Sequence, residues 1–409
     1  MAGVDLKLVD ADLLDRMRLV SEAFRPAAPV DRRSLFAGRT EQIADVFAAV
    51  AQPGQHAVIY GERGVGKTSL ASVSVELLTG ARVLTARATC DVSDDFASVW
   101  RKALDEIVLH STTQAVGFGE RIESTSRPAS ELFGVDPITP DAVRRALQRV
   151  AQHGQFAVFI DEFDRLRDVE SRILFADTIK TLSDRLVGAT VFLIGVADSV
   201  GELIREHRSI ERALVQIHMP RMTPTELAEI ATTGITSARM QIAASAVRKV
   251  TTLSQGLPHY TQLLTQLAAQ AALGRRRVDV TSKDVDFAVG RAIERAQQSI
   301  VEAYREATSD ASQISPRVLL ACALAQEDEF GFFSATDARA ALGRIVDKPV
   351  GRAAFSQRLA ALADDTRHAV LHKHGPSKAP RYRFADPLLQ PYVAMRGVSE
   401  GIIRIQDLH

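Results

Sequence analysis

Residues 61–68, Gly61-Glu-Arg-Gly-Val-Gly66-Lys67-Thr68, match the pattern G-x-x-x-x-G-K-[ST] in full. An apolar run, His56–Tyr60, enters it, and a helical pattern near residues 66–79 leaves it. Glycines let main-chain N–H groups turn inward around an anion, and the following helix directs its positive end at that anion. The sequence therefore predicts a loop that holds the phosphates of a nucleotide between a strand and a helix.

The chemistry of this loop is divided among its side chains. Lys67 supplies a point charge for the β- and γ-phosphates of ATP, and the Thr68 hydroxyl is a candidate magnesium ligand. No single residue excludes a guanine nucleotide. The residues expected to contact the nucleotide are Gly61, Glu62, Arg63, Gly64, Val65, Gly66, Lys67, Thr68 and Ser69.

A second apolar run, Phe156–Ile160, is followed directly by two carboxylates, Asp161 and Glu162. A single carboxylate at the end of a strand is often only part of an acidic turn. Beside a complete phosphate loop, the pair predicts that Asp161 holds Mg²⁺ through water and that Glu162 polarises the attacking water. The sequence thus predicts an ATPase with ATP and Mg²⁺ as its cofactors.

Short apolar runs alternate with longer helical patterns through the first half of the chain, which is typical of an α/β fold with a parallel sheet covered by helices on both faces. Expected helices lie near 66–79, 95–110, 141–153, 168–186 and 200–212. The expected strands are His56–Tyr60, Arg82–Thr89, Phe156–Ile160, Ala189–Val196 and Leu214–Met219.

The patterns divide the chain into four parts. An amino-terminal helix within residues 1–28 precedes an ATPase core, 29–220, in which the Ser-, Thr-, Gly- and Pro-rich segment 111–140 is expected to be a surface insertion. Helical patterns without strands predict a small lid over 221–310 that ends in one long connecting helix. Three helices followed by a hairpin, in 311–409, have the order of a winged helix.

The charge pattern bears on possible partners. The whole chain has no net charge, so contact with nucleic acid has to come from a local patch. Residues 344–384 are locally basic, which favours contact with double-stranded DNA, although a solvated surface or a protein contact fits the same pattern. The cations are Arg344, Lys348, Arg352, Arg358, Arg367, Lys373, Lys378, Arg381 and Arg383, against Asp347, Asp364 and Asp365, with His368, His372 and His374 in the expected wing.

We expect a cytoplasmic protein that has no contact with a membrane. The acids in the amino-terminal residues argue against a signal peptide, and no stretch approaches the roughly 18–20 apolar residues of a spanning helix. Two cysteines, Cys90 and Cys322, lie far apart without metal-ligand spacing, which suits a reducing compartment.

Taken in order, these motifs resemble the AAA+ and STAND branch of P-loop ATPases, closest to the origin-recognition and Cdc6-like group. The resemblance covers roughly residues 30–395 and rests on FAGRTEQI, GERGVGKTS, FAVFIDEFDRL, FLIGVADS, SIERALVQIHMP, SQGLPHYTQLL and a terminal winged helix. It implies a homo-oligomer that forms with ATP, in which one subunit supplies an arginine finger to its neighbour.

The resemblance also assigns roles beyond the two motifs. Asp198 occupies the place of a residue that orients water or senses phosphate, with Ser199 as a substitute and a helix cap as the plain alternative. Arg212 occupies the place of the arginine finger, with Arg208 in reserve. An exposed, solvated arginine is the alternative for Arg212.

Two further assignments concern the lid and the adenine. Pro258 and His259 resemble a G-x-P motif of the lid, where Pro258 starts a helix and His259 faces the nucleotide or merely caps that helix. Arg39, in the FAGR segment, is a candidate near adenine, and Phe36 is expected in the core.

Three functions are compatible with these patterns. The first is an ATP-driven switch that assembles on DNA, favoured by the basic wing. The second is a regulator, of the kind used in defence or transposition, whose ATP-gated assembly recruits a separate partner protein. The third is a scaffold stabilised by nucleotide, which Glu162 argues against because a scaffold does not need a carboxylate that polarises water.

Overall fold

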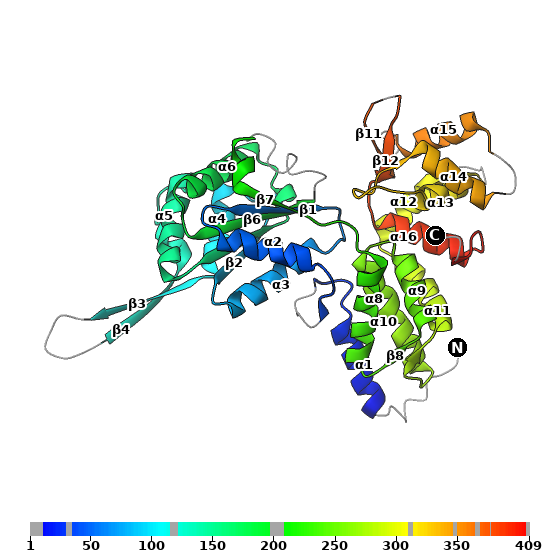
Figure 1. The fold of residues 1–409 in the computed structure, drawn as a ribbon, viewed down its shortest axis with the longest axis horizontal. Helices are drawn as coiled ribbons and strands as arrows, with labels where there is room; N and C mark the ends of the chain where they lie inside the picture. Colours follow the sequence, from blue (N-terminus) through cyan, green and yellow to red (C-terminus); the bar gives the residue numbers. More distant parts are fainter. Residues whose placement is uncertain are drawn as a thin grey trace. The chain divides into compact units, whose positions relative to one another are not determined.

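The structure, a computed structural model, describes residues 11–29, 35–114, 122–196, 208–309, 314–346, 350–364, 369–376 and 378–405 (Figure 1). Contacts divide the chain into two compact units. The core unit comprises 30–62 and 67–219, and the second unit comprises 1–29, 63–66 and 220–409. No helix among the described residues is long and apolar enough to span a membrane.

A five-stranded parallel sheet forms the centre of the core unit (Figure 1). Its carboxyl edge collects the ends of the strands that carry the predicted motifs, since strands in a parallel sheet all run in one direction. The spatial order is β2 (Leu84–Thr89), β5 (Phe156–Asp161), β6 (Ala189–Val196), β1 (His56–Gly61) and β7 (Leu214–His218).

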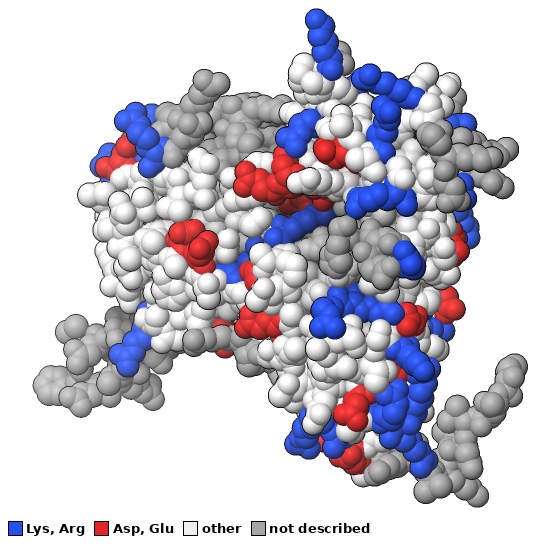
Figure 2. Space-filling view, turned by 45° about the vertical axis from the view of Figure 1, so that its right-hand side comes forward, with Lys and Arg blue, Asp and Glu red and all other residues white. Residues whose placement is uncertain are grey.

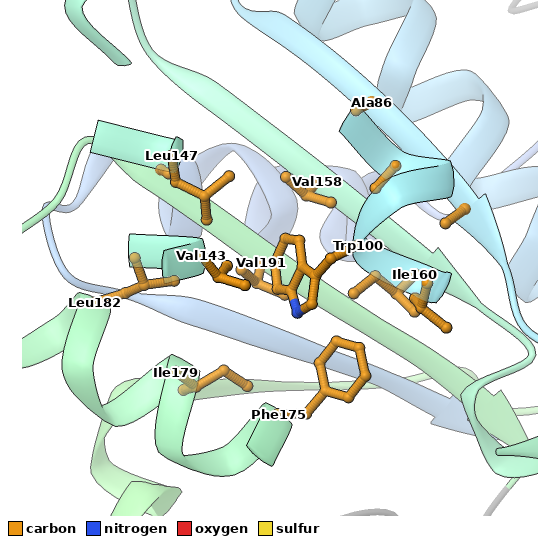
Figure 3. Packing of buried hydrophobic residues seen from close by; sticks show 14 of the residues in the cluster. Ala86, Trp100, Val143, Leu147, Val158, Ile160, Phe175, Ile179, Leu182 and Val191 are labelled. Carbon is orange, nitrogen blue, oxygen red and sulfur yellow. The ribbon is translucent and has the colours of Figure 1, made fainter. Parts of the chain in front are cut away.

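Helices cover both faces of this sheet, as the sequence predicts (Figure 1). One face is covered by α2 (Thr40–Ala51) and α3 (Lys67–Gly80), and the other by α4 (Phe96–Asp105), α5 (Pro140–Val150) and α6 (Val169–Asp184). Figure 3 shows Trp100 and Phe175 packed among aliphatic side chains between the sheet and this second helical layer. Two short 3-10 turns flank α5: η2 (Ala129–Phe133) lies before it and η3 (Ala151–His153) directly after it.

All five expected strands are present, but one expected helix beside the insertion was wrong in its extent. The helix predicted over 95–110 ends at Asp105, because residues 108–114 pair instead with 122–128. Within the predicted insertion 111–140, part of the chain forms a two-stranded ribbon. Strands β3 (Val108–Gln114) and β4 (Ile122–Pro128) form an antiparallel ribbon that extends away from the core sheet in Figure 1, and α5 begins at Pro140. Thr112 and Thr113 are β-branched and favour this extended state.

The second unit begins with a group of helices. It contains α8 (Pro224–Ser237), α9 (Ala244–Ser254), α10 (Pro258–Gly274) and α11 (Ser282–Glu294), with a short parallel pair, β8 (Gln241–Ile242) and β9 (Asp279–Val280). The amino-terminal helix α1 (Ala11–Ala23) packs on α8 and α10. Gly234 is required at this contact, because a Cβ on it would lie 2.3 Å from Cζ of Phe24.

The single long helix predicted at the end of the lid is wrong. The chain forms α11 and then α12 (Gln298–Thr308), separated by three residues. Gln297 has an extended conformation, with φ −56° and ψ 140°, so the helical hydrogen-bond ladder stops and begins again. Neither Gly nor Pro marks this break in the sequence.

The carboxy-terminal region combines helices with a small antiparallel sheet in the order β10-β12-β11. Strand β11 begins at Leu371, and His368, which the sequence places in the expected wing, lies outside the described residues. Strand β10 and helix α16 were not predicted. The elements are α13 (Ile314–Ala323), β10 (Phe333–Ser334), α14 (Ala335–Ile345), α15 (Arg352–Leu362), β11 (Leu371–His374), β12 (Arg381–Phe384) and α16 (Leu389–Ser399).

Candidate nucleotide site

The predicted phosphate loop connects the end of β1 to the start of α3. Gly61 and Gly66 have φ values of 148° and 99°, in a region that L side chains rarely adopt. At Gly61 a Cβ would also lie 2.5 Å from the carbonyl oxygen of Met219, so the loop passes too close to the end of β7 for any side chain. Glycine is thus required by the main-chain path at both positions.

Lys67 is buried at the first residue of α3. Its Nζ donates hydrogen bonds to the carbonyl oxygens of Gly61 and Glu62, at 2.9 and 2.7 Å. The ammonium group is held by carbonyl oxygens of the loop itself, so an incoming phosphate can replace them as its hydrogen-bond acceptor. Thr68 follows in the first turn of α3, with its side chain half-buried.

The two carboxylates at the end of β5 have different environments. The Asp161 side chain is 5% exposed, and its Oδ1 accepts a hydrogen bond from the amide of Glu162 at 2.9 Å. Glu162 is 45% exposed and has a left-handed conformation, with φ 53°. Its Oε2 accepts a hydrogen bond of 2.6 Å from Nη1 of Arg165. The candidate metal carboxylate is therefore fixed inside the protein, and the candidate water-polarising carboxylate faces solvent.

Arg87, on β2, joins the two motifs. Its Nη2 lies 3.4 Å from Oδ2 of Asp161, and its Nη1 donates a hydrogen bond of 2.8 Å to Oγ of Ser72 on α3. Ser72 in turn donates to the carbonyl oxygen of Thr68 at 2.9 Å. The side chain of Asp161 and the main chain of Thr68 thus belong to one hydrogen-bonded network.

This donor set fits a magnesium nucleotide. Mg²⁺ takes oxygen ligands and usually combines one or two protein groups with phosphate oxygens and water. A threonine hydroxyl at the start of a helix and a buried carboxylate supply such groups. The positive φ values of the loop glycines suit a loop whose main-chain N–H groups turn toward an anion.

Sequence reasoning missed Arg87, Ser72 and Arg165. Arg87 had a signal, because it is a cation within an apolar strand, two residues before the carboxyl edge. Ser72 and Arg165 had none, because a serine on a helix and an arginine after an acidic turn are ordinary surface residues.

The remaining candidates are placed as follows. Asp198 and Ser199 lie outside the described residues. Arg212 is exposed in the short 3-10 turn η5 (Arg208–Ala213), directly before β7. Arg39 is 4% exposed and left-handed at the start of α2, with φ 59°, and Phe36 is half-buried.

The lid candidates lie within the second unit. Pro258 is the first residue of α10, as predicted. His259 has its Nδ1 2.8 Å from the carbonyl oxygen of Pro26, and burial lowers the pKa of its imidazole below the usual range. His259 is therefore uncharged near neutral pH and can contribute hydrogen bonds but no charge to a phosphate.

Comparison with known proteins agrees with this geometry. The family model described as "AAA ATPase domain" matches residues 35–194. The core unit of this chain is accordingly an AAA ATPase domain, with the P-loop α/β fold. A comparison with curated proteins gave no match.

Solved structures resemble the chain over most of its length. The Walker-type ATPase paby2304 of Pyrococcus abyssi is 14% identical, with a TM-score of 0.51, and the match covers 90% of this chain and 98% of that one. The ORC2 protein of Aeropyrum pernix, with bound ADPNP and ADP, is 15% identical at a TM-score of 0.47, over 92% and 97% of the two chains. The RuvB Holliday junction branch migration motor of Thermotoga maritima is 14% identical at a TM-score of 0.45, over 85% and 93%.

Proposed function

We propose that this protein is an ATP-hydrolysing AAA+ switch that assembles with itself in the presence of ATP and contacts double-stranded DNA through a carboxy-terminal winged helix. The observation that carries the ATPase part is the network from Thr68 through Ser72 and Arg87 to Asp161. It supports one site built from the phosphate loop and the β5 carboxylates, which lie far apart in the sequence.

The residues divide the work as follows. Lys67 and the amides of α3 bind the phosphates, and Thr68 and Asp161 hold Mg²⁺. When bound, Mg²⁺ neutralises charge that develops on the phosphates. Glu162 orients and polarises the attacking water, a role for which its solvent-facing position is suited.

Two substitutions test the ATPase directly. Lys67→Ala should abolish nucleotide binding, measured by fluorescence polarisation of a labelled ATP analogue. Glu162→Gln should retain that binding and reduce turnover roughly 10²–10⁴-fold, the usual size of a general-base contribution. Arg101→Gln, at an exposed position of α4, is the matched control. Tight ATP binding by Lys67→Ala, or unchanged turnover in Glu162→Gln, contradicts the assignment.

Self-assembly rests on Arg212, which is exposed directly before β7. We propose that it enters the site of a neighbouring subunit and stabilises the charge on the γ-phosphate. Arg212→Ala should lose turnover on its own and regain part of it when mixed with Glu162→Gln protein, since each variant supplies what the other lacks. Mixtures that stay inactive at every ratio refute a finger in trans.

Residues 311–405 supply the features that support a DNA-binding winged helix. The order α13, β10, α14, α15, β11, β12 contains three helices and a hairpin. On α15, Phe355 and Leu359 are buried, whereas Arg352, Ser356 and Gln357 are exposed, as expected for a helix that presents one face to a groove.

The basic side chains of this region are not equivalent. Figure 2 shows Lys and Arg side chains at the top of the view, at the height of β11, β12 and α15 in Figure 1. Arg381 has its charge engaged by Asp328 at 2.7 Å, which reduces its value for phosphate contact. Lys373 and Lys378 are exposed on the hairpin. We therefore assign the phosphate contacts to these two lysines and to Arg352.

A salt titration tests this assignment. Binding through phosphates weakens with salt with a slope of about −0.9 per contact, so removing Lys373 and Lys378 together should reduce the slope by about 2. Lys180→Ala, at an exposed position of α6, should leave it unchanged. Duplex affinity that is independent of salt argues against the proposed surface.

The ATPase rate, measured against protein concentration with and without duplex DNA, separates the two leading functions. A rate per subunit that rises with concentration and again with DNA supports the DNA-assembled switch. A rate that rises with concentration but ignores DNA supports the STAND-type regulator, which recruits a separate partner protein.

A further inference from the structure

Arg87 has no role in the phosphate-binding pattern, yet it contacts the carboxylate that the pattern leads us to expect at the metal. In the sheet, Thr89 of β2 is paired with Asp161 of β5, and Arg87 is paired with Phe159. Paired residues in neighbouring strands share a face, and residues two apart in a strand do too. Arg87 and Asp161 therefore lie on the same face, the one that α3 covers.

The position of the guanidinium is set mainly by α3. Its bond to Oγ of Ser72 measures 2.8 Å, whereas its approach to Oδ2 of Asp161 is longer, at 3.4 Å. The main-chain N–H of Arg87 is also held, by Oε2 of Glu106 at 3.0 Å. A guanidinium anchored in this way can give up its contact with Asp161 without leaving its place.

The charges at this point conflict with metal binding. Asp161 is almost completely buried, and the guanidinium of Arg87 places a positive charge beside its carboxylate. A Mg²⁺ ion that approaches the same carboxylate is repelled by this fixed cation and has to compete with it for Oδ2.

We propose that Arg87 is a positioning residue that holds Asp161 against α3 and, by competing for its carboxylate, weakens metal binding at the nucleotide site. The inference rests on the proposed function, since it concerns the Mg²⁺ of the bound nucleotide. It assigns to one side chain two opposed effects: it fixes the ligand and it lowers the affinity of that ligand for the metal.

The sign of the effect distinguishes this role from simple structural support. Loss of a supporting residue disorders Asp161 and weakens the metal site. Loss of a competing cation leaves a buried, uncompensated carboxylate, which strengthens metal binding. Arg87→Gln should therefore bind the metal more tightly, by about tenfold, or about 1.4 kcal/mol.

The experiment uses Mn²⁺ as a spectroscopic substitute for Mg²⁺ in the full chain with bound ADP, so that hydrolysis does not interfere. Electron paramagnetic resonance measures free Mn²⁺, and a parallel titration with EDTA present measures ADP affinity without metal. We expect Arg87→Gln to bind Mn²⁺ about tenfold more tightly than wild type. Arg87→Lys, which keeps the charge, and Arg101→Gln, which removes a charge elsewhere, should stay within threefold.

Each other outcome has a definite meaning. Equal or weaker Mn²⁺ binding by Arg87→Gln, in protein whose melting temperature matches wild type, overturns the inference, as does an Arg87→Lys variant that binds as tightly as Arg87→Gln. Wild-type protein that binds neither ADP nor Mn²⁺ refutes the proposed function itself, and the inference with it. If Arg87→Gln does not fold, Ser72→Ala replaces it. This change releases the guanidinium from α3 and lets it pair more closely with Asp161, so Mn²⁺ binding should weaken about threefold, while unchanged or tighter binding refutes the proposal.

Discussion

Phe175 connects the aromatic core of the core unit to the turn that follows β5. It is 1% exposed on α6, and its ring centroid lies 5.0 Å from that of Phe96, 5.7 Å from that of Trp100 and 5.2 Å from that of Phe163. Phe163 follows Glu162 directly in the chain. Removing the Phe175 ring should therefore lower stability and also loosen the turn that carries the candidate water-polarising carboxylate.

The size of the effect follows from this packing. Replacing a buried Phe by Ala costs about 3–5 kcal/mol, and three aromatic contacts place Phe175→Ala in the upper half of that range. Trp100 is the only tryptophan in the sequence, so its fluorescence during urea unfolding follows the core unit. Phe287→Ala, on α11 of the second unit, removes a ring that is 49% exposed and should leave this transition unchanged. A loss below about 1 kcal/mol for Phe175→Ala would show that the cluster does not stabilise the core.

Three further predictions concern single side chains. Burial lowers the pKa of His56 to about 4 from 6.5. The unfolded state therefore binds the proton first, and the free energy of unfolding falls by about 3 kcal/mol as the pH drops from 6.5 towards 4. His56→Asn should abolish this contribution in acid-unfolding curves. Burial raises the pKa of the Cys90 thiol to about 12 and that of Cys322 still further, so neither should react with a thiol reagent until the protein unfolds, and fast labelling of the native protein would contradict their burial. Gly234→Ala should displace Phe24 and make the link after α1 more sensitive to proteolysis, whereas an unchanged cleavage pattern would show that the contact is not needed.

The sequence predicted the parts of the fold in which local patterns are strong. Local patterns predict the five apolar strands, the phosphate loop and the helices on both faces. A run such as Phe156–Ile160 is identified as a strand from its own residues and those next to it in the sequence. On α15, the buried residues Phe355 and Leu359 likewise stand at helical spacing, which is a local pattern.

What could not be predicted depends on pairing between distant residues. The ribbon β3–β4 has polar strands, so no alternation of apolar residues reveals it, and only the pairing of residues 108–114 with 122–128 defines it. The break between α11 and α12 has no Gly or Pro to mark it. Arg87 meets Asp161 only because β2 lies beside β5 in the sheet, and the sequence order of the strands does not give that adjacency.

The two carboxylates of the site show the same distinction between what a motif determines and what the fold adds. The motif places Asp161 and Glu162 side by side, but the fold buries the first, ties it to α3 through Arg87, and leaves the second in solvent beside Arg165. An ion pair as exposed as that of Glu162 contributes about 1 kcal/mol at most, so Glu162 can leave Arg165 at little cost when water and nucleotide arrive. Asp161 has no such freedom. This difference is what the proposed chemistry needs, because a metal ligand works best when its position is fixed, whereas a group that polarises water has to adjust to a substrate that is not yet bound.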